Sequence, residues 1–207
     1  MRRALFVLSA LMALCFGAAA GCGSTTPAGN PSSSASGAAQ FTVFKNAQYL
    51  FSLAYPAGWT RAVSMSASAS PQTGERLLAV TLIDPQVAEV QGGQLADGES
   101  VEVYQLDRAV EPGVRYASVA MRIMGGSLLP HLQNVEVKAK PKEVSVHGDP
   151  GWRVAYTYAL HGHSMLALSV LVLKHRYAYW VTGQSTAETW SAMWPRLRIS
   201  LGTFRVR

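Results

Sequence analysis

Cysteine is nearly absent from this chain of 207 residues, because its two cysteines, Cys15 and Cys22, both lie close to the N-terminus. The rest of the chain therefore has no disulfide and no thiolate metal cluster. Charged residues are also scarce, at 14% against 49% hydrophobic residues. This composition is typical of a chain that buries an apolar core, and the core alone must stabilise the folded part.

Catalytic signatures are missing as well. The sequence contains neither Gly-x-Ser-x-Gly nor Ser-x-x-Lys, neither His-Glu-x-x-His nor a glycine-rich phosphate loop, and its carboxylates are scattered. The formal charge of +6 comes from basic residues spread along the chain, whereas nucleic-acid binders usually cluster them. We therefore expect a protein that is not an enzyme, needs no cofactor and binds no nucleic acid.

The N-terminus has the pattern of an export signal. A basic pair at residues 2–3 precedes an apolar run over residues 4–14, and the small residues 19–21 then lead to Cys22. This segment resembles the bacterial lipobox, in which small residues precede a cysteine that is acylated before cleavage. The resemblance implies cleavage between Gly21 and Cys22, and acyl chains such as palmitate on Cys22. Ordinary secretion without lipid and an uncleaved membrane anchor remain as alternatives.

The pattern divides the chain into three parts. Residues 1–21 are expected to be a lipoprotein signal peptide, and residues 22–40 a lipidated cysteine with a tether rich in Ser, Gly and Pro. The tether has no charge and no large apolar residue, so it is predicted to be a coil spanning about 23 Å. Residues 41–207 are expected to form one domain. The predicted location is the extracytoplasmic side of a cell membrane, with the membrane and an unidentified envelope protein as partners.

The domain is predicted to have an α+β fold, with helices packed on an antiparallel sheet. Strand patterns cover residues 41–44, 49–55, 77–83, 100–105, 142–147, 152–160, 165–173 and 177–182. Three- and four-residue spacing predicts a helix between Pro112 and Leu132. A last helix is predicted from Thr186, with Thr186 as its cap, and Pro195 is expected to kink or split it.

Residues 49–59, which read Tyr-Leu-Phe-Ser-Leu-Ala-Tyr-Pro-Ala-Gly-Trp, resemble the opening of the PsbP and Mog1-like family. Gly-x-x-Gly-Trp at residues 148–152 and the closing Thr-Phe at 203–204 fit the same pattern, which covers nearly all of residues 41–207. The resemblance implies an α/β/α sandwich. It does not imply one function, because the family includes photosystem accessory proteins, a Ran-binding factor and bacterial lipoproteins of unknown role.

The same resemblance makes specific expectations for the Tyr-Pro-x-Gly-Trp segment. Pro56 should end its strand because it has no N–H to donate, and Gly58 should permit a turn. Trp59 should then be buried against the sheet and a helix.

Two clusters of polar residues have alternative interpretations. His161 and His163 suggest a metal pair, but they flank Gly162 at a predicted hairpin turn without further ligands nearby, so no metal is expected. Lys138, Lys140 and Lys142 are candidate contacts for a partner or for anionic lipid. A sheet edge guarded by lysine and proline explains the same pattern.

The five tryptophans are expected mainly in the core, with a ligand groove as the alternative. They are Trp59, Trp152, Trp180, Trp190 and Trp194. Together these observations favour a non-catalytic binding or assembly accessory in the cell envelope. The alternative is a carrier of a small apolar ligand in a groove between sheet and helix.

Overall fold

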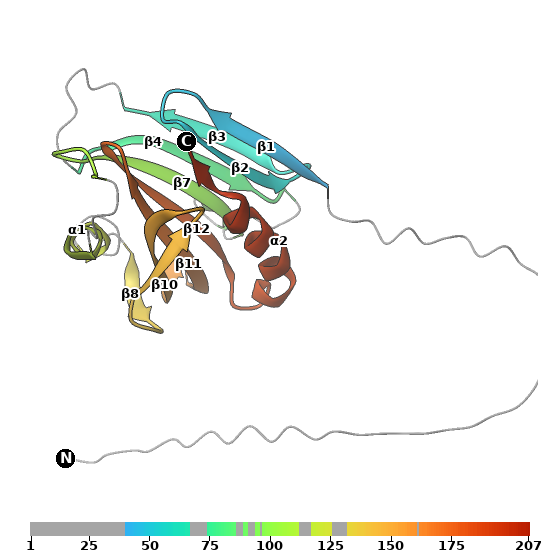
Figure 1. Ribbon diagram of the computed structural model, residues 1–207. Helices are drawn as coiled ribbons and strands as arrows, with labels where there is room; N and C mark the ends of the chain where they lie inside the picture. Colours follow the sequence, from blue (N-terminus) through green and yellow to red (C-terminus); the bar gives the residue numbers. More distant parts are fainter. Residues whose placement is uncertain are drawn as a thin grey trace, which may run out of the picture. The chain divides into compact units, whose positions relative to one another are not determined.

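Antiparallel strands dominate the computed structural model (Figure 1). The structure describes residues 40–66, 74–85, 89–90, 94–95, 97–111, 117–125, 132–160 and 162–207. In chain order the elements are β1 (Phe41–Asn46), β2 (Phe51–Pro56), β3 (Thr60–Met65), β4 (Arg76–Ile83), β5 (Glu89–Val90), β6 (Gln94–Leu95), β7 (Gly98–Gln105), α1 (Ala117–Ile123), β8 (Gln133–Val137), β9 (Lys142–Val146), β10 (Asp149–Leu160), β11 (His163–Lys174), β12 (Tyr177–Thr186), α2 (Trp190–Thr203) and β13 (Arg205–Val206). The predicted signal peptide, Gly21, Cys22, His161 and all of the predicted tether except Gln40 lie outside the described residues.

The main layer is a sheet that, among the described residues, has eight strands in the order β3-β4-β7-β12-β11-β10-β8, with β9 also paired to β10. Its long central strands come from the alternating segments that the sequence predicts. The hairpin of β10 and β11 turns at Gly162, whose φ of 86° suits glycine. The expected α+β fold with an antiparallel sheet is confirmed.

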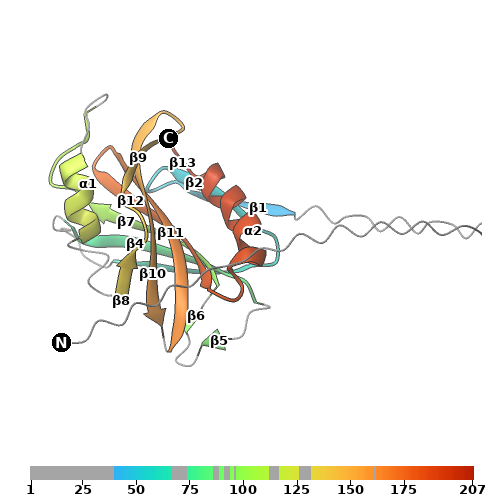
Figure 2. The same cartoon turned by 90° about the horizontal axis from the view of Figure 1, so that it is seen from below.

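Each face of this sheet carries its own hydrophobic core. Figure 2 shows α1 and α2 on opposite sides of the sheet. One face packs against α2 and against a small sheet in the order β1-β2-β13. The other face packs against α1, with Ala120, Ile123 and Met124 buried there. Because side chains alternate along a strand, each central strand contributes to both cores. No helix in the described parts of the chain is long and apolar enough to span a bilayer.

The Tyr-Pro-x-Gly-Trp segment has the geometry expected from its sequence. β2 ends at Pro56, and Gly58 has a φ of 88°. Trp59 is only 7% exposed and belongs to the core between the large sheet, the small sheet and α2. The three expectations for Pro56, Gly58 and Trp59 are therefore confirmed.

Helix α2 corrects two expectations. It begins at Trp190 rather than near Thr186, because Thr186 is the last residue of β12 and the N-cap is Thr189 without a side-chain cap bond. Pro195 lies inside one helix that runs unbroken to Thr203, so the expected split is wrong. Proline removes only one backbone hydrogen bond here, and burial of side chains on both sides of it holds the helix on the sheet.

The segment before β8 corrects another expectation. In the described part of the predicted helix over 112–132, α1 covers Ala117–Ile123, whereas Leu132 lies next to β8 and outside any helix. Met124 and Gly125 continue α1 as a π-type turn, whereas residues 126–131 of the predicted helix lie outside the described residues. β8 itself is mostly exposed and polar, so it lacks the alternation that identifies strands, and only its pairing with β10 defines it.

A carboxyl group is buried between the sheet and α2. Glu99 of β7 is 2% exposed, and its side chain forms a short hydrogen bond with Ser200 of α2. Ser200 Oγ has a single proton and lies 2.5 Å from the carbonyl oxygen of Ala54, which can only accept. Ser200 Oγ is also the donor to Glu99, so its one proton is shared between two acceptors. Burial raises the pKa of Glu99 from 4.5 to about 8, although the Ser200 contact acts in the opposite direction.

Candidate functional site

A groove runs between α2 and the sheet, with a volume of about 370 Å³. Its lining comes from five elements of the chain. The lining residues are Val144, Ser145, Val146, Arg153, Leu168, Val170, Val181, Trp194, Arg198, Leu201, Gly202 and Phe204. The groove is therefore mainly aliphatic and aromatic, as ligand-binding clefts usually are.

The position of α2 explains why the groove exists. The helix packs on β12 and β2, and it approaches β12 closely because Gly183 has no side chain. A Cβ at Gly183 would lie 3.2 Å from Leu197 Cδ2 and 3.3 Å from Leu201 Cδ1. Since α2 lies over this side of the sheet, the same face of β9, β10 and β11 is left as the opposite wall of the groove.

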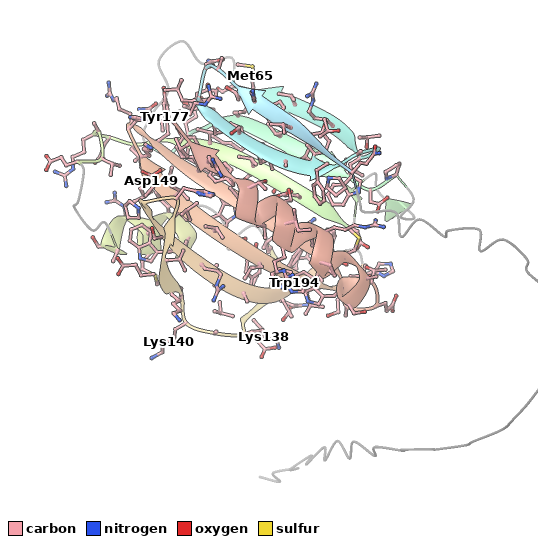
Figure 3. The ribbon with its side chains drawn as sticks, turned by 45° about the vertical axis from the view of Figure 1, so that its right-hand side comes forward. Met65, Lys138, Lys140, Asp149, Tyr177 and Trp194 are labelled. Carbon is pink, nitrogen blue, oxygen red and sulfur yellow. The ribbon has the colours of Figure 1, made fainter. Side chains whose placement is uncertain are left out.

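The floor of the groove is fully buried, whereas its walls are accessible. Val181 and Phe204 at the bottom are 0% and 1% exposed. Val170 and Trp194 on the two walls are half-buried, and Figure 3 shows Trp194 on α2. Trp194 stacks on Trp190, with ring centroids 5.4 Å apart, so its indole is held in place by a neighbour on the same helix. An apolar ligand in the groove would remove these wall side chains from water.

Polar contacts fix one end of the groove. His147, in the turn between β9 and β10, donates from Nε2 to the carbonyl oxygen of Gly202 at 3.1 Å. Lys174 Nζ bridges Asp149 and the carbonyl oxygen of Val206, at 3.1 Å each. These bonds join the β9–β10 turn to the end of α2 and to β13, so the groove wall does not depend on apolar packing alone.

Two guanidinium groups provide the charge of the groove. Arg153 of β10 and Arg198 of α2 both line it and are both exposed. Arg198 follows Trp194 by four positions, which places both side chains on the same face of the helix. Neither arginine takes part in the ion pairs of the described residues. Those pairs are Arg76–Glu102, Lys138–Glu136, Lys174–Asp149 and Arg196–Asp84.

The opposite face of the sheet has a smaller hollow of about 270 Å³. Its polar groups already bond one another. Glu102 accepts from Arg76 at 2.9 Å and from the Tyr104 hydroxyl at 2.5 Å, and Tyr158 donates to Gln184 at 2.8 Å. Burial raises the pKa of Tyr104 and of Tyr158 above the usual range, so both remain neutral donors. Because these bonds stay within the protein, the groove at α2 is the stronger candidate.

The structure places the predicted site residues in different locations. Lys138 and Lys140 lie at the loop between β8 and β9 (Figure 3), and Lys142 is the first residue of β9. Lys138 Nζ lies 2.6 Å from Glu136 Oε2. His163 is exposed at the start of β11, and no group of three or more potential metal ligands occurs among the described residues.

Among the tryptophans, Trp59, Trp152 and Trp180 are buried in the two cores. Trp190 and Trp194 are partly buried against the core at α2, and Trp194 also lines the groove. The predictions from the sequence missed Arg153 and Arg198. The spacing Trp194, Arg198, Leu201 was an available signal, because it puts a cation between two apolar residues on one helical face.

Comparison with solved structures identifies the architecture. The solution structure of the cyanobacterial PsbP protein (CyanoP) from Synechocystis sp. PCC 6803 matches 84% of this chain and 96% of its own, with a TM-score of 0.55 and 13% identity. The chain has the PsbP-like fold. No family model and no curated protein sequence matches it.

Two further matches to solved structures have lower scores. LpqN of Mycobacterium tuberculosis, described as involved in cell envelope biogenesis, has a TM-score of 0.45 and 9% identity, and the match covers 83% of this chain and 87% of LpqN. A protein of unknown function from Pseudomonas aeruginosa has a TM-score of 0.44 and 12% identity over 81% of this chain and 97% of its own. At 13% identity the match to the cyanobacterial protein shows the fold alone, and the function has to be argued from the groove.

Proposed function

We propose that the protein is a non-catalytic lipoprotein of the bacterial cell envelope that binds a small apolar ligand in the groove beside α2. The observation that carries this proposal is the groove itself, an open cleft of about 370 Å³ with an apolar floor between helix and sheet. Its size lies within the range of about 300–1,000 Å³ found for ligand pockets. Of the two functions that the sequence favours, a carrier of an apolar ligand fits this geometry directly.

The chemistry of the lining supports binding rather than catalysis. The lining residues offer apolar side chains, one hydroxyl and two guanidinium groups. General acid–base catalysis needs a group that gains and loses a proton near neutral pH, such as imidazole or a carboxyl. The groove is therefore suited to holding a ligand without changing it.

The location rests on the N-terminal sequence. An export signal followed by small residues and Cys22 supports acylation of Cys22 and anchoring at the extracytoplasmic face of a membrane. Two or more acyl chains hold a protein at a membrane effectively permanently, whereas one binds only marginally. A domain tethered in this way would meet apolar ligands as they leave or enter the bilayer.

The proposal is tested by filling the groove. Gly37–Arg207 is a compact unit of its own, so a chain that begins at Gly23 keeps the whole domain. Binding of an environment-sensitive apolar dye is measured by fluorescence for this chain and for Val144→Trp, which places an indole in the groove. We expect dye binding to be lost in Val144→Trp and kept in the matched control Val63→Trp, which alters an exposed valine on β3. Equal binding by all three proteins would refute the proposal.

An assembly accessory is the second candidate, because the outer edge of β3 is suited to a protein partner. Among the described strands β3 pairs only with β4, and Val63 and Met65 on it are 49% and 53% exposed. Met65 lies near the end of this edge strand (Figure 3). Partner chains often add a strand to such edges. Chemical cross-linking in membranes, compared between the native chain and Val63→Asp, would reveal a partner that depends on β3.

A further inference from the structure

The charges of the α2 groove point to the chemistry of its ligand, an inference that rests on the proposed function. Arg153 and Arg198 come from opposite walls, one from the sheet and one from the helix. Both side chains are exposed, and neither has a carboxylate partner among the described residues. A pair of guanidinium groups above an apolar floor has unused capacity for an anion.

A third cation strengthens the positive potential on this wall. Lys142 lies directly opposite Arg153 in the β9–β10 ladder, so the two side chains share the face that borders the groove. The nearby acidic groups do not offset them. Asp149 is engaged by Lys174 Nζ at 3.1 Å, and Glu143 belongs to the opposite face of β9 because neighbouring residues alternate.

The apolar part of the groove defines the rest of the ligand. Val181 and Phe204 form a buried floor that offers no hydrogen-bond partner from its side chains. The volume of about 370 Å³ is near the lower end for ligand pockets, which suits one alkyl chain better than two. A floor of this kind accepts a hydrocarbon chain, whereas the arginines accept an anionic end.

We infer that the groove binds a single-chain anionic amphiphile of the fatty-acid type. The alkyl chain lies on the floor between α2 and the sheet, and the carboxylate is bound by Arg153 and Arg198. Guanidinium groups suit this role because they can donate two parallel hydrogen bonds to a carboxylate. Neutral amphiphiles of the same length fill the floor but leave the guanidinium groups without an anion.

The test compares two ligands that differ only in charge. Dodecanoate and dodecanol, each below its aggregation limit, compete with a bound apolar dye on the chain from Gly23 onward. We expect dodecanoate to bind about 10- to 100-fold more tightly than dodecanol, as the loss of charge-assisted hydrogen bonds predicts. The preference should weaken at high salt, because the arginines are exposed.

Variants identify the arginines as the source of the preference. In Arg153→Gln/Arg198→Gln the dodecanoate affinity should fall to that of dodecanol, while dodecanol binding is unchanged. Arg61→Gln, which removes an exposed cation of β3 that lies over the Phe44 ring, should retain the preference. If the double variant does not fold, Arg198→Gln alone, on the exposed side of α2, makes the same comparison and should reduce the preference.

The outcomes separate this inference from the proposed function. Equal affinity for dodecanoate and dodecanol, both abolished by Val144→Trp, would overturn the anionic ligand and leave the apolar carrier intact. Absence of binding by either ligand and by the dye would overturn both. A dimer that Val144→Trp dissociates, measured by sedimentation, would show that a second copy of the chain fills the groove, and the inference would then be wrong.

Discussion

Replacing the buried Glu99 with glutamine should make the protein more stable at neutral and alkaline pH. In the folded chain Glu99 is buried and accepts from Ser200, whose one proton is shared with the carbonyl oxygen of Ala54. Burial raises the pKa of Glu99 from 4.5 to about 8. In the unfolded chain the group ionises with an ordinary pKa, so folding above pH 4.5 requires the uptake of a proton.

The sign and size of the effect follow from this difference. A raised carboxyl pKa contributes stability that is fully present below pH 4.5 and is lost as the pH rises toward about 8. Each pH unit in that window lowers the free energy of unfolding by about 1.4 kcal/mol. Glutamine keeps an acceptor for Ser200 Oγ but does not titrate. As the pH rises from 5 to 8, the free energy of unfolding of Glu99→Gln should therefore increase by about 3–4 kcal/mol relative to that of the native chain.

Urea unfolding of the chain from Gly23 onward, measured at several pH values from 5 to 8, tests this reasoning. The native chain should lose stability steadily across the range, and Glu99→Gln should lose much less. Glu188→Gln, which removes an exposed carboxylate, controls for the change in net charge. If Glu99→Gln and the native chain lose stability in parallel, Glu99 does not bind the proton that we assign to it.

Three further predictions concern the anchor, the tether and the core. Cys22→Ala should abolish acylation and leave the protein unprocessed or released from membranes, and mass spectrometry of a mature chain that starts elsewhere without lipid would contradict the anchor. Residues 23–40 should be disordered, with backbone order parameters below about 0.6 by NMR; values near 0.85 would rule out a tether. Trp59→Ala should cost about 3–5 kcal/mol in urea unfolding, because Trp59 is 7% exposed in the core. An unchanged midpoint would mean that the indole contributes little to packing.

Local sequence signals predicted those parts of the fold in which the conformation is decided by neighbours in the chain. Pro56 and Gly58 act through their own backbone angles, so the end of β2 and the turn before Trp59 could be predicted from three residues. The end of β12 could not. Thr186 has the chemistry of a helix cap, yet its backbone N–H donates to the buried Asp97 at 2.8 Å, a partner from a distant part of the chain.

The candidate site depends on contacts between distant segments and was therefore harder to predict. Arg153 and Arg198 meet only because β10 and α2 pack around one groove, and no local pattern specifies that. Glu99 did leave a signal, because it has the same strand parity as Val101 and Val103, which are both buried. The strand predicted from the sequence began at Ser100, whereas β7 begins at Gly98, so the prediction did not include Glu99.

The small sheet constrains the order in which the protein can fold during its synthesis. β13 pairs with β2, and Ala54 N–H donates to Thr203 Oγ1 at 2.8 Å across 149 positions of the chain. Contacts of such long sequence separation form late, because a long loop has to close first. At about 5–20 residues per second, a nascent chain exposes the apolar face of the β1–β2 hairpin for roughly 8–30 s before α2 and β13 exist. Throughout that interval Phe51 and Leu53, which are 2% and 1% exposed in the finished fold, lack the C-terminal segment that helps to bury them, so the hairpin presents an apolar surface.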